Sequence, residues 1–337
     1  MAESSARHYT DPVNILVFGA GVIGTVYASK LRQAGNAVTV LARGARLDDI
    51  RRHGLILESV VDRRRSECRV EVTEGLSPRD RYDLILVAVR RDQLDASMAS
   101  LAANSVVPTI LFMLNNPLGT SRLVEALGKD RVVQGFPGVG GTKEGHVVQY
   151  AMISQQPTTI GEVDGRRTSR LEELVGVFRA SQLATRVERH MDAWLKAHAF
   201  FVTAVCGAIY QAGGDCRRLS LDNAALELLV AAVSEGFGAL RASGLPVTPF
   251  ALKVLFTWMP RSFAVGYWRR FFSTSTAEYV FGAHARAAAG EMLEVARDCR
   301  ALLHTAGVEA VSWQRLMTSI ESYAPSSPGG THELPPG

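Results

Sequence analysis

Cysteine is scarce in this 337-residue chain, and its four occurrences argue against two classes of protein. The positions are Cys68, Cys206, Cys216 and Cys299, which have neither the close pairing of a zinc site nor the density of a disulfide framework. We therefore expect reduced thiols, no metal centre and a cytoplasmic protein.

Long apolar runs and a strong excess of charge are also missing. The apolar stretch at 224–240 is interrupted by Glu227 and Glu235, so it falls short of the ~20 residues that span a bilayer. Residues 1–12 are polar and lack the basic start and apolar stretch of a secretory signal. A net charge of +4 is too mild to indicate a nucleic-acid partner. We expect neither a membrane nor a nucleic acid among the partners.

One segment has an informative pattern, because the apolar stretch Ile15-Leu-Val-Phe18 leads directly into three glycines spaced G-x-G-x-x-G. In dinucleotide-binding proteins the first glycine allows a tight turn, the second lets the backbone approach a pyrophosphate, and the third lets the next helix pack closely. The helix predicted at 22–34 presents its N-terminus to the phosphates and ends at Gly35, a common C-terminal cap. An ordinary glycine-rich turn is the alternative, but the flanking strand and helix favour a bound dinucleotide. The predicted contacts are Gly19, Ala20, Gly21, Val22, Ile23 and Gly24.

The end of the second predicted strand, 37–43, indicates which dinucleotide is bound. An NAD enzyme usually carries an acidic residue there for the ribose hydroxyls, whereas a basic residue suits a 2′-phosphate. Here Ala42 and Arg43 occupy that place and Arg46 follows closely, which predicts a bidentate clamp on the extra phosphate. The sequence therefore favours NADPH/NADP+ as the cofactor. Solvated loop arginines without a ligand are the alternative.

Two further apolar strands end in polar residues. The strand predicted at 82–89 is followed by Arg90, and the strand predicted at 106–114 is followed by Asn115. In an open parallel sheet the ligand lies beyond the carboxyl ends of the strands. We therefore expect one crevice to be bordered by Gly19, Arg43, Arg90 and Asn115.

The pattern changes in the second half of the chain. Strand signals continue to about residue 160, whereas from Leu171 the spacing is helical and no convincing strand follows Thr185. Such a change indicates a second domain. We predict an α/β fold with an N-terminal Rossmann-type doubly wound parallel sheet followed by an all-helical C-terminal domain. The predicted segments are a disordered start at 1–12, an NADPH-binding domain at 13–185, a helical substrate and dimerisation domain at 186–322 and a disordered tail at 323–337.

Lysine is rare as well, with five lysines among the 37 Lys and Arg residues. Four of them stand in polar helix or loop contexts, but Lys196 lies among Trp194, Leu195 and Phe200. Burial lowers the pKa of an ammonium group, so a buried lysine can release and recover a proton, which a guanidinium cannot do. Lys196 is therefore the predicted general acid. A lysine that snorkels from a mostly buried helix is the alternative.

The combination of these motifs resembles the ketopantoate reductases (2-dehydropantoate 2-reductases). That family has the same glycine turn, Arg and Asn after the second and fourth strands, a Trp-x-Lys pattern on a helix and a later Thr-x-Glu. This chain has Trp194-Leu-Lys196 and Thr276-Ala-Glu278, and the resemblance covers roughly residues 13–320. It implies NADPH-dependent hydride transfer to the carbonyl of a 2-oxo acid, with Lys196 as proton donor. Glu278 would then be the counter-charge of Lys196 or a hydrogen-bond partner for it or for the substrate. The alternative is that Glu278 only complements a helix dipole.

The chain departs from the family where the substrate is held. The family's two asparagines, four and eight residues after the lysine, are replaced by Phe200 and Ala204, and the family's serine falls on Gly266. Thr203 is the polar residue that helical periodicity aligns with the lysine, and Ser262 is the nearest upstream hydroxyl. The predicted substrate contacts are Asn115, Phe200, Thr203 and Ser262.

Three classes of function stay open. The first is an NADPH-dependent 2-oxo acid reductase acting on ketopantoate, or on a larger, less polar keto or imine substrate of specialised metabolism. The second is an opine-type dehydrogenase, which usually depends on a His-Asp pair that is not clear here. The third is a non-catalytic NADPH-binding regulator, against which Lys196 and Glu278 argue. The expected partners are a small-molecule keto substrate and a second copy of the chain in a homodimer.

Overall fold

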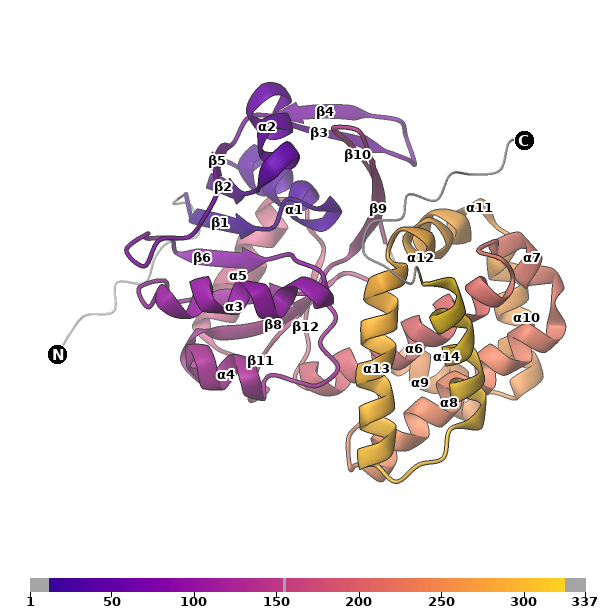
Figure 1. Cartoon of the computed structure of the whole chain (residues 1–337). Coiled ribbons are helices and arrows are strands. Elements are labelled where there is room, and N and C mark those ends of the chain that lie inside the picture. Colours follow the sequence, from indigo (N-terminus) through magenta and orange to yellow (C-terminus); the bar gives the residue numbers. More distant parts are fainter. Residues whose placement is uncertain (1–11, 154–155, 325–337) are drawn as a thin grey trace. The chain divides into compact units, whose positions relative to one another are not determined.

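The computed structural model describes residues 12–153 and 156–324, which divide into two compact units, one up to Lys196 and one from Ala197 onward (Figure 1). The sequence placed the domain boundary earlier, after residue 185. The segments predicted to be disordered, 1–12 and 323–337, lie outside the described residues except at their inner ends. There, Tyr323 closes the last helix and Ala324 is buried.

The first unit is built on an eight-stranded sheet with the order β12-β11-β8-β7-β6-β1-β2-β5. Its strands are β1 (Asn14–Phe18), β2 (Ala37–Leu41), β5 (Glu71–Thr73), β6 (Leu84–Val87), β7 (Ile110–Met113), β8 (Val132–Phe136), β11 (Thr158–Glu162) and β12 (Thr185–Val187). From β8 to β5 the neighbours are all parallel, whereas β11 pairs antiparallel with β8. β6 and β7 are buried along their whole length, because a parallel strand covered on both faces is apolar throughout.

Helices cover both faces of this sheet (Figure 1). Those of the first unit are α1 (Val22–Gln33), α2 (Gly44–His53), α3 (Leu94–Ala103), α4 (Ser121–Leu127) and α5 (Ser169–Ala180), with short 3-10 turns at Arg91–Gln93 and Lys129–Arg131. Leu31 of α1 and Phe178 of α5 join the apolar cluster on one face, and Leu101 of α3 and Leu123 of α4 join the cluster on the other. The predicted doubly wound Rossmann-type sheet is confirmed.

A second, four-stranded sheet was not predicted. It has the order β4-β3-β10-β9, with β3 (Leu55–Ser59), β4 (Arg65–Cys68), β9 (Val139–Glu144) and β10 (Val147–Met152). β3 pairs with β10 in a register that places Ile56 opposite Val147, so strands far apart in the chain form it. The sequence predicted no strand after Thr185, whereas β12 covers Thr185–Val187. This strand was missed because it has only three residues and none of them is buried.

The described part of the second unit contains helices only, as predicted. They are α6 (Met191–Gln211), which begins in the first unit, α7 (Cys216–Leu221), α8 (Asn223–Ala242), α9 (Phe250–Lys253), η3 (Val254–Trp258), α10 (Arg261–Phe272), α11 (Ser275–Ala277), η4 (Glu278–Gly282), α12 (Ala283–Ala287), α13 (Ala289–Thr305) and α14 (Val311–Tyr323). Phe200, Phe237 and Trp313 are fully or almost fully buried at the centre of one large apolar cluster.

Two of these helices are long and apolar enough to cross a membrane by length and composition. They are α6 and α8, and the most apolar window of α6 is entirely buried inside the protein. The sequence reading considered only the run at 224–240 and overlooked α6. The burial of α6 is that of a core helix in a globular unit.

Candidate active site

The glycine turn has the geometry that its spacing predicts. Gly19 has φ +113°, and a Cβ there would lie 2.7 Å from the carbonyl oxygen of Ala88 at the end of β6. A Cβ at Gly24 would overlap the carbonyl oxygen of Gly19, so only glycine lets α1 start this close to the turn. A Cβ at Gly21 would meet no atom of the described chain within 4 Å. The turn is therefore closed on the protein side and open at Gly21, which suits a bound pyrophosphate.

Two arginines follow β2, and they have different environments. Arg43 is exposed and donates from Nε to the carbonyl oxygen of Glu74 at 3.2 Å. Arg46 is half-buried and donates from Nε to the carbonyl oxygen of Ala20 at 3.1 Å and from Nη2 to Oγ1 of Thr25 at 3.0 Å. Its Nη1 is buried and meets no hydrogen-bond acceptor among the described residues. Burial lowers the pKa of the Arg46 guanidinium. Arg46 thus ties α2 to the glycine turn and keeps one donor for an added anion.

The topology brings the predicted cofactor residues to one edge of the sheet. Gly19, Arg43, Arg90 and Asn115 each come after one of four neighbouring parallel strands, β1, β2, β6 and β7. Arg90 is half-exposed and forms an ion pair with Asp92 at 3.0 Å. Asn115 is buried. Their roles as cofactor or substrate contacts stay predictions.

Lys196 lies in the first turns of α6 and is only 8% exposed. Met191, Trp194 and Leu195, close to it in the sequence, form a small buried apolar cluster, and the Trp194 ring lies 5.3 Å from that of Phe136 in β8. The apolar surroundings predicted from the sequence are therefore present. The ammonium nevertheless has a charged partner, because it forms an ion pair with Asp192 one helical turn earlier. Sequence reasoning missed Asp192, although the i,i+4 spacing of Asp and Lys is a known favourable pair.

The turn that follows β7 reaches this ion pair. Gly119 has φ +85°, and a Cβ there would lie 2.8 Å from Oδ1 of Asp192 and 3.3 Å from Nζ of Lys196. The side chain of Asn116 closes the turn by donating from Nδ2 to the carbonyl oxygen of Gly119 at 2.7 Å. The carboxyl edge of the sheet and the lysine are thus neighbours within the first unit.

Glu278 belongs to the second unit and has a partner there. It is the first residue of η4, its side chain is 40% exposed, and it forms an ion pair with Arg286. Arg286 also donates to the carbonyl oxygen of Gly214 at 2.8 Å, which fixes its position. Within its own unit Glu278 pairs with Arg286, as Lys196 pairs with Asp192 in the first unit, and a role of Glu278 toward Lys196 or the substrate stays a prediction.

Two of the predicted substrate contacts are core residues of the second unit. Thr203 is 1% exposed, and its hydroxyl donates to the carbonyl oxygen of Ala199 at 2.7 Å and accepts from Nε1 of Trp313 at 3.3 Å. Phe200 is fully buried with its ring 6.2 Å from that of Trp313 and against Gly236. Helical periodicity aligned Thr203 with the lysine, and the structure adds that the most apolar window of α6 is entirely buried. The role of Thr203 as a substrate contact stays a prediction.

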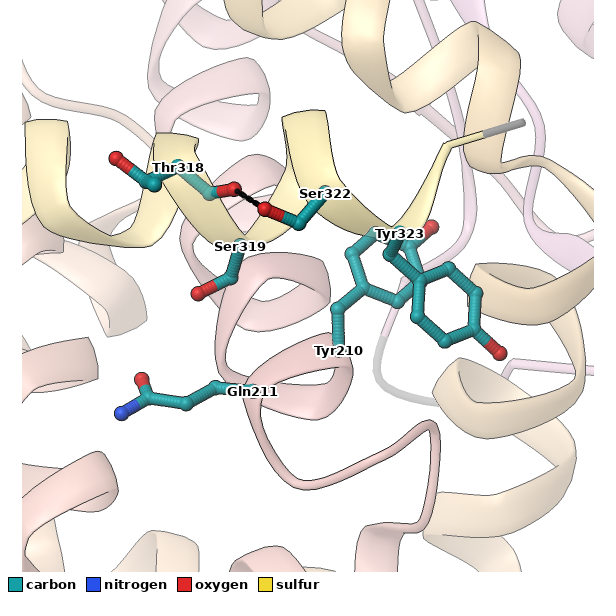
Figure 2. Close-up of a pocket in the computed structure, with 6 residues that line it drawn as sticks. All are labelled: Tyr210, Gln211, Thr318, Ser319, Ser322 and Tyr323. Carbon is teal, nitrogen blue, oxygen red and sulfur yellow. Dashed lines mark hydrogen bonds between the residues drawn. The ribbon is translucent and has the colours of Figure 1, made fainter. Parts of the chain in front are cut away.

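Two surface cavities are formed by residues of the second unit, among others. One, of about 320 Å³, includes the predicted Ser262 and the family's serine position, Gly266, and is lined by Asn223, Glu227, Arg261, Ser262, Val265, Gly266 and Arg269. Figure 2 shows the other, of about 260 Å³, lined by Tyr210, Gln211, Thr318, Ser319, Ser322 and Tyr323. Its two tyrosine rings stack at 4.3 Å and no charged side chain lines it, so it offers a 2-oxo acid no ionic anchor.

His198 is a buried histidine of α6. Burial lowers the pKa of His198 to about 3, and the nearby His284 adds to this effect, so the imidazole is neutral at pH 7. Within the described ranges, no group of three or more His, Cys, Asp or Glu side chains is placed to hold a metal ion.

Known proteins resemble this chain in sequence and in fold. A family model described as ketopantoate reductase PanE/ApbA matches residues 15–165. The 2-dehydropantoate 2-reductase of Pyrococcus horikoshii is 27% identical over 59% of this chain, and the chain spans 64% of that relative's length. These matches make the N-terminal part of the chain similar to the ketopantoate reductases and support a divergent relationship to that family.

Solved structures share the whole two-unit fold. The 2-dehydropantoate 2-reductase from Geobacter metallireducens is 19% identical, with a TM-score of 0.73 over 91% of this chain and 99% of its own. D-mandelate dehydrogenase with NADH and anilino(oxo)acetate is 14% identical, with a TM-score of 0.73 over 92% of this chain and 98% of its own. At these identities the likeness establishes the fold.

Proposed function

We propose that this protein is an NADPH-dependent reductase that adds a hydride to the carbonyl of a 2-oxo acid. One observation carries the proposal: the buried, ion-paired Lys196 lies against the turn after β7, on the sheet edge that also bears the glycine turn. The family match and the NADH bound in D-mandelate dehydrogenase support a nicotinamide cofactor.

Residues of the first unit fit such a cofactor. Gly21 leaves room for a pyrophosphate at the N-terminus of α1. The buried Nη1 of Arg46 lacks an acceptor within the described chain, and Arg43 on the same loop is exposed. A 2′-phosphate would accept charge-assisted hydrogen bonds from these guanidinium groups, so we favour NADPH over NADH. When bound, the cofactor supplies the hydride.

Lys196 supplies the proton in this proposal. Hydride addition leaves negative charge on the carbonyl oxygen, and an ammonium within hydrogen-bond reach stabilises that charge and donates a proton to the oxygen. The product is a 2-hydroxy acid. The neutral amine then regains a proton from water.

We propose ketopantoate or a larger, less polar 2-oxo acid as the substrate. Positions 200 and 204 carry Phe and Ala, so neither offers an amide to a hydroxylated acid. The shared fold of D-mandelate dehydrogenase, solved with anilino(oxo)acetate, supports the larger acid as the second candidate. We further propose that the protein is a cytoplasmic homodimer, which sedimentation of the purified chain and fractionation of its cells would test.

A panel of 2-oxo acids, followed by the loss of NADPH absorbance, tests the function. The panel includes ketopantoate, aryl-substituted 2-oxo acids, and 2-oxo acids mixed with an amino acid to detect opine-type chemistry. We expect Lys196→Ala to lower kcat by about 100-fold or more with nearly unchanged NADPH affinity. Lys143→Ala, at an exposed lysine, is the matched control. NADPH binding without turnover on any substrate would instead favour the regulator, and full turnover in Lys196→Ala would require another proton donor.

A further inference from the structure

We propose that Asp192 is a positioning residue that holds the Lys196 ammonium in place for proton transfer. In this proposal the backbone of Gly119 packs against the ion pair and helps to fix its position. The inference rests on the proposed function and deepens it. It assigns a role to two residues that the motif pattern did not single out.

The ion pair is unevenly buried. The Lys196 side chain is 10% exposed, whereas that of Asp192 is 38% exposed. Asp192 lies in the first turn of α6, where the helix dipole favours a negative charge, and it precedes its lysine by four residues, the favourable order for such a pair. The Lys196 side chain is thus buried, whereas the Asp192 side chain is partly exposed to solvent.

The opposite side of the pair is formed by backbone. Because a Cβ at Gly119 would come within 2.8 Å of Asp192 and 3.3 Å of Lys196, both side chains are seated against the bare Cα of this residue. Asn116 fixes the turn through its bond to the carbonyl oxygen of Gly119. The turn carries no charge, so within the first unit the Asp192 carboxylate is the ionisable group in contact with the ammonium.

This arrangement restricts one end of a flexible side chain. A lysine ammonium has three N–H donors. One is engaged by Asp192, and the others stay available to a carbonyl oxygen at the sheet edge. Without the carboxylate the four-carbon stem can adopt other rotamers, and the ammonium loses the interaction that favours its charged form.

Two variants with matched controls test the proposal. Asp192→Asn removes the charge at constant size, and Glu294→Gln does the same at a similarly exposed acid, 41% exposed and paired with Arg297. Gly119→Ala adds a methyl group against the pair at φ +85°. Its control is Gly128→Ala, where φ is +84° and a Cβ would meet no described atom within 4 Å. The controls carry the same chemical or backbone change without touching Lys196.

We expect Asp192→Asn and Gly119→Ala to lower kcat about 10-fold or more while the NADPH dissociation constant stays within about twofold, because the losses arise at the proton-transfer step. The alkaline limb of the kcat profile should move to lower pH in Asp192→Asn and stay in place in Asp192→Glu, which keeps the charge. Neither control should change kcat by more than about twofold. Wild-type kcat and pH profile in Asp192→Asn, with Lys196→Ala inactive, would overturn the role of Asp192 and leave the proposed function intact.

A second readout needs no turnover. With five lysines, NMR of the chain carrying 13C-labelled lysine gives few side-chain signals, and Lys196→Ala identifies the signal of Lys196. We expect that signal to lie apart from the others and to move toward them in Asp192→Asn. A Lys196 signal that is unchanged by Asp192→Asn would refute the positioning role even if the panel finds no substrate.

Discussion

Alanine at Gly21 and alanine at Gly24 should have opposite consequences. Gly21 precedes α1 with φ −72° and ψ −166°, which any residue can adopt, and its missing Cβ would point into open space in the described structure. Gly24 has no such room, since a Cβ there would overlap the carbonyl oxygen of Gly19 and lie 3.2 Å from Cγ1 of Val17. The first substitution therefore tests ligand binding and the second tests packing.

For Gly21→Ala we expect a free energy of unfolding within about 1 kcal/mol of the parent, because the change is unstrained and slightly restricts the unfolded chain. NADPH affinity should fall by about tenfold or more, equivalent to ~1.4 kcal/mol, because the methyl group occupies the space proposed for the pyrophosphate. For Gly24→Ala the helix must move away from β1. Overpacking of this kind costs roughly 1 to 3 kcal/mol or more, and at ~2 to 4 °C per kcal/mol the Tm should fall by several degrees.

Thermal unfolding and isothermal titration with NADPH measure the two effects on the same samples. If Gly21→Ala binds NADPH as tightly as the parent, the turn does not hold the cofactor and the proposed function loses its starting point. If Gly24→Ala is as stable as Gly21→Ala, the close approach of α1 to the turn is wrong.

Three further predictions concern the cofactor, a buried histidine and the substrate. NADPH should bind more tightly than NADH, and Arg43→Asp should erase or reverse the preference; equal binding of both by the parent contradicts this reading of the loop after β2. Because burial lowers the pKa of His198 from 6.5 to about 3, the unfolded chain binds the extra proton, so its contribution to stability is complete above pH 6.5. That contribution should be lost by up to about 1.4 kcal/mol per pH unit as the pH falls from 6.5 toward 3. Urea unfolding measures this, and His198→Gln should flatten the slope whereas His304→Gln, at an exposed histidine, should not. For ketopantoate we expect kcat/KM below about 10⁵ M⁻¹s⁻¹, and a higher value in steady-state kinetics would show that the pocket keeps the family's substrate.

The parallel sheet was predictable because its strands are local apolar runs that end in recognisable turns. β6 and β7 could be placed from composition alone, since each is buried on both faces. The small sheet could not be placed in this way. β4 reads Arg-Ser-Glu-Cys and has no apolar pattern. β3 begins with the apolar run Leu-Ile-Leu, but its pairing with β10 is distant in sequence and no local pattern predicts it.

The sequence could indicate candidate site residues by their residue type. It could not indicate which side chains are covered by other parts of the fold. Lys196 was singled out because a lysine among apolar residues is unusual, and its burial is confirmed, whereas its role as proton donor stays a prediction. Periodicity predicted the direction of the Thr203 side chain but not its burial or the Trp313 indole that donates to its hydroxyl. Its role as a substrate contact stays a prediction. Asp192 and Gly119 were missed because their contact with Lys196 depends on a loop and a helix that meet in space.

Arg46 shows how the free protein is prepared for a ligand. Two of its donor nitrogens hold α2 and the glycine turn together, and a third is buried without an acceptor among the described residues. An unmade hydrogen bond in a buried place destabilises the folded state by roughly 1 to 3 kcal/mol. The chain accepts this penalty when it folds, so an anion that arrives later finds a rigid donor already aimed and loses little conformational entropy in binding it. The ligand-free protein consequently has the lower free energy of unfolding, and binding of an anion at Arg46 raises it.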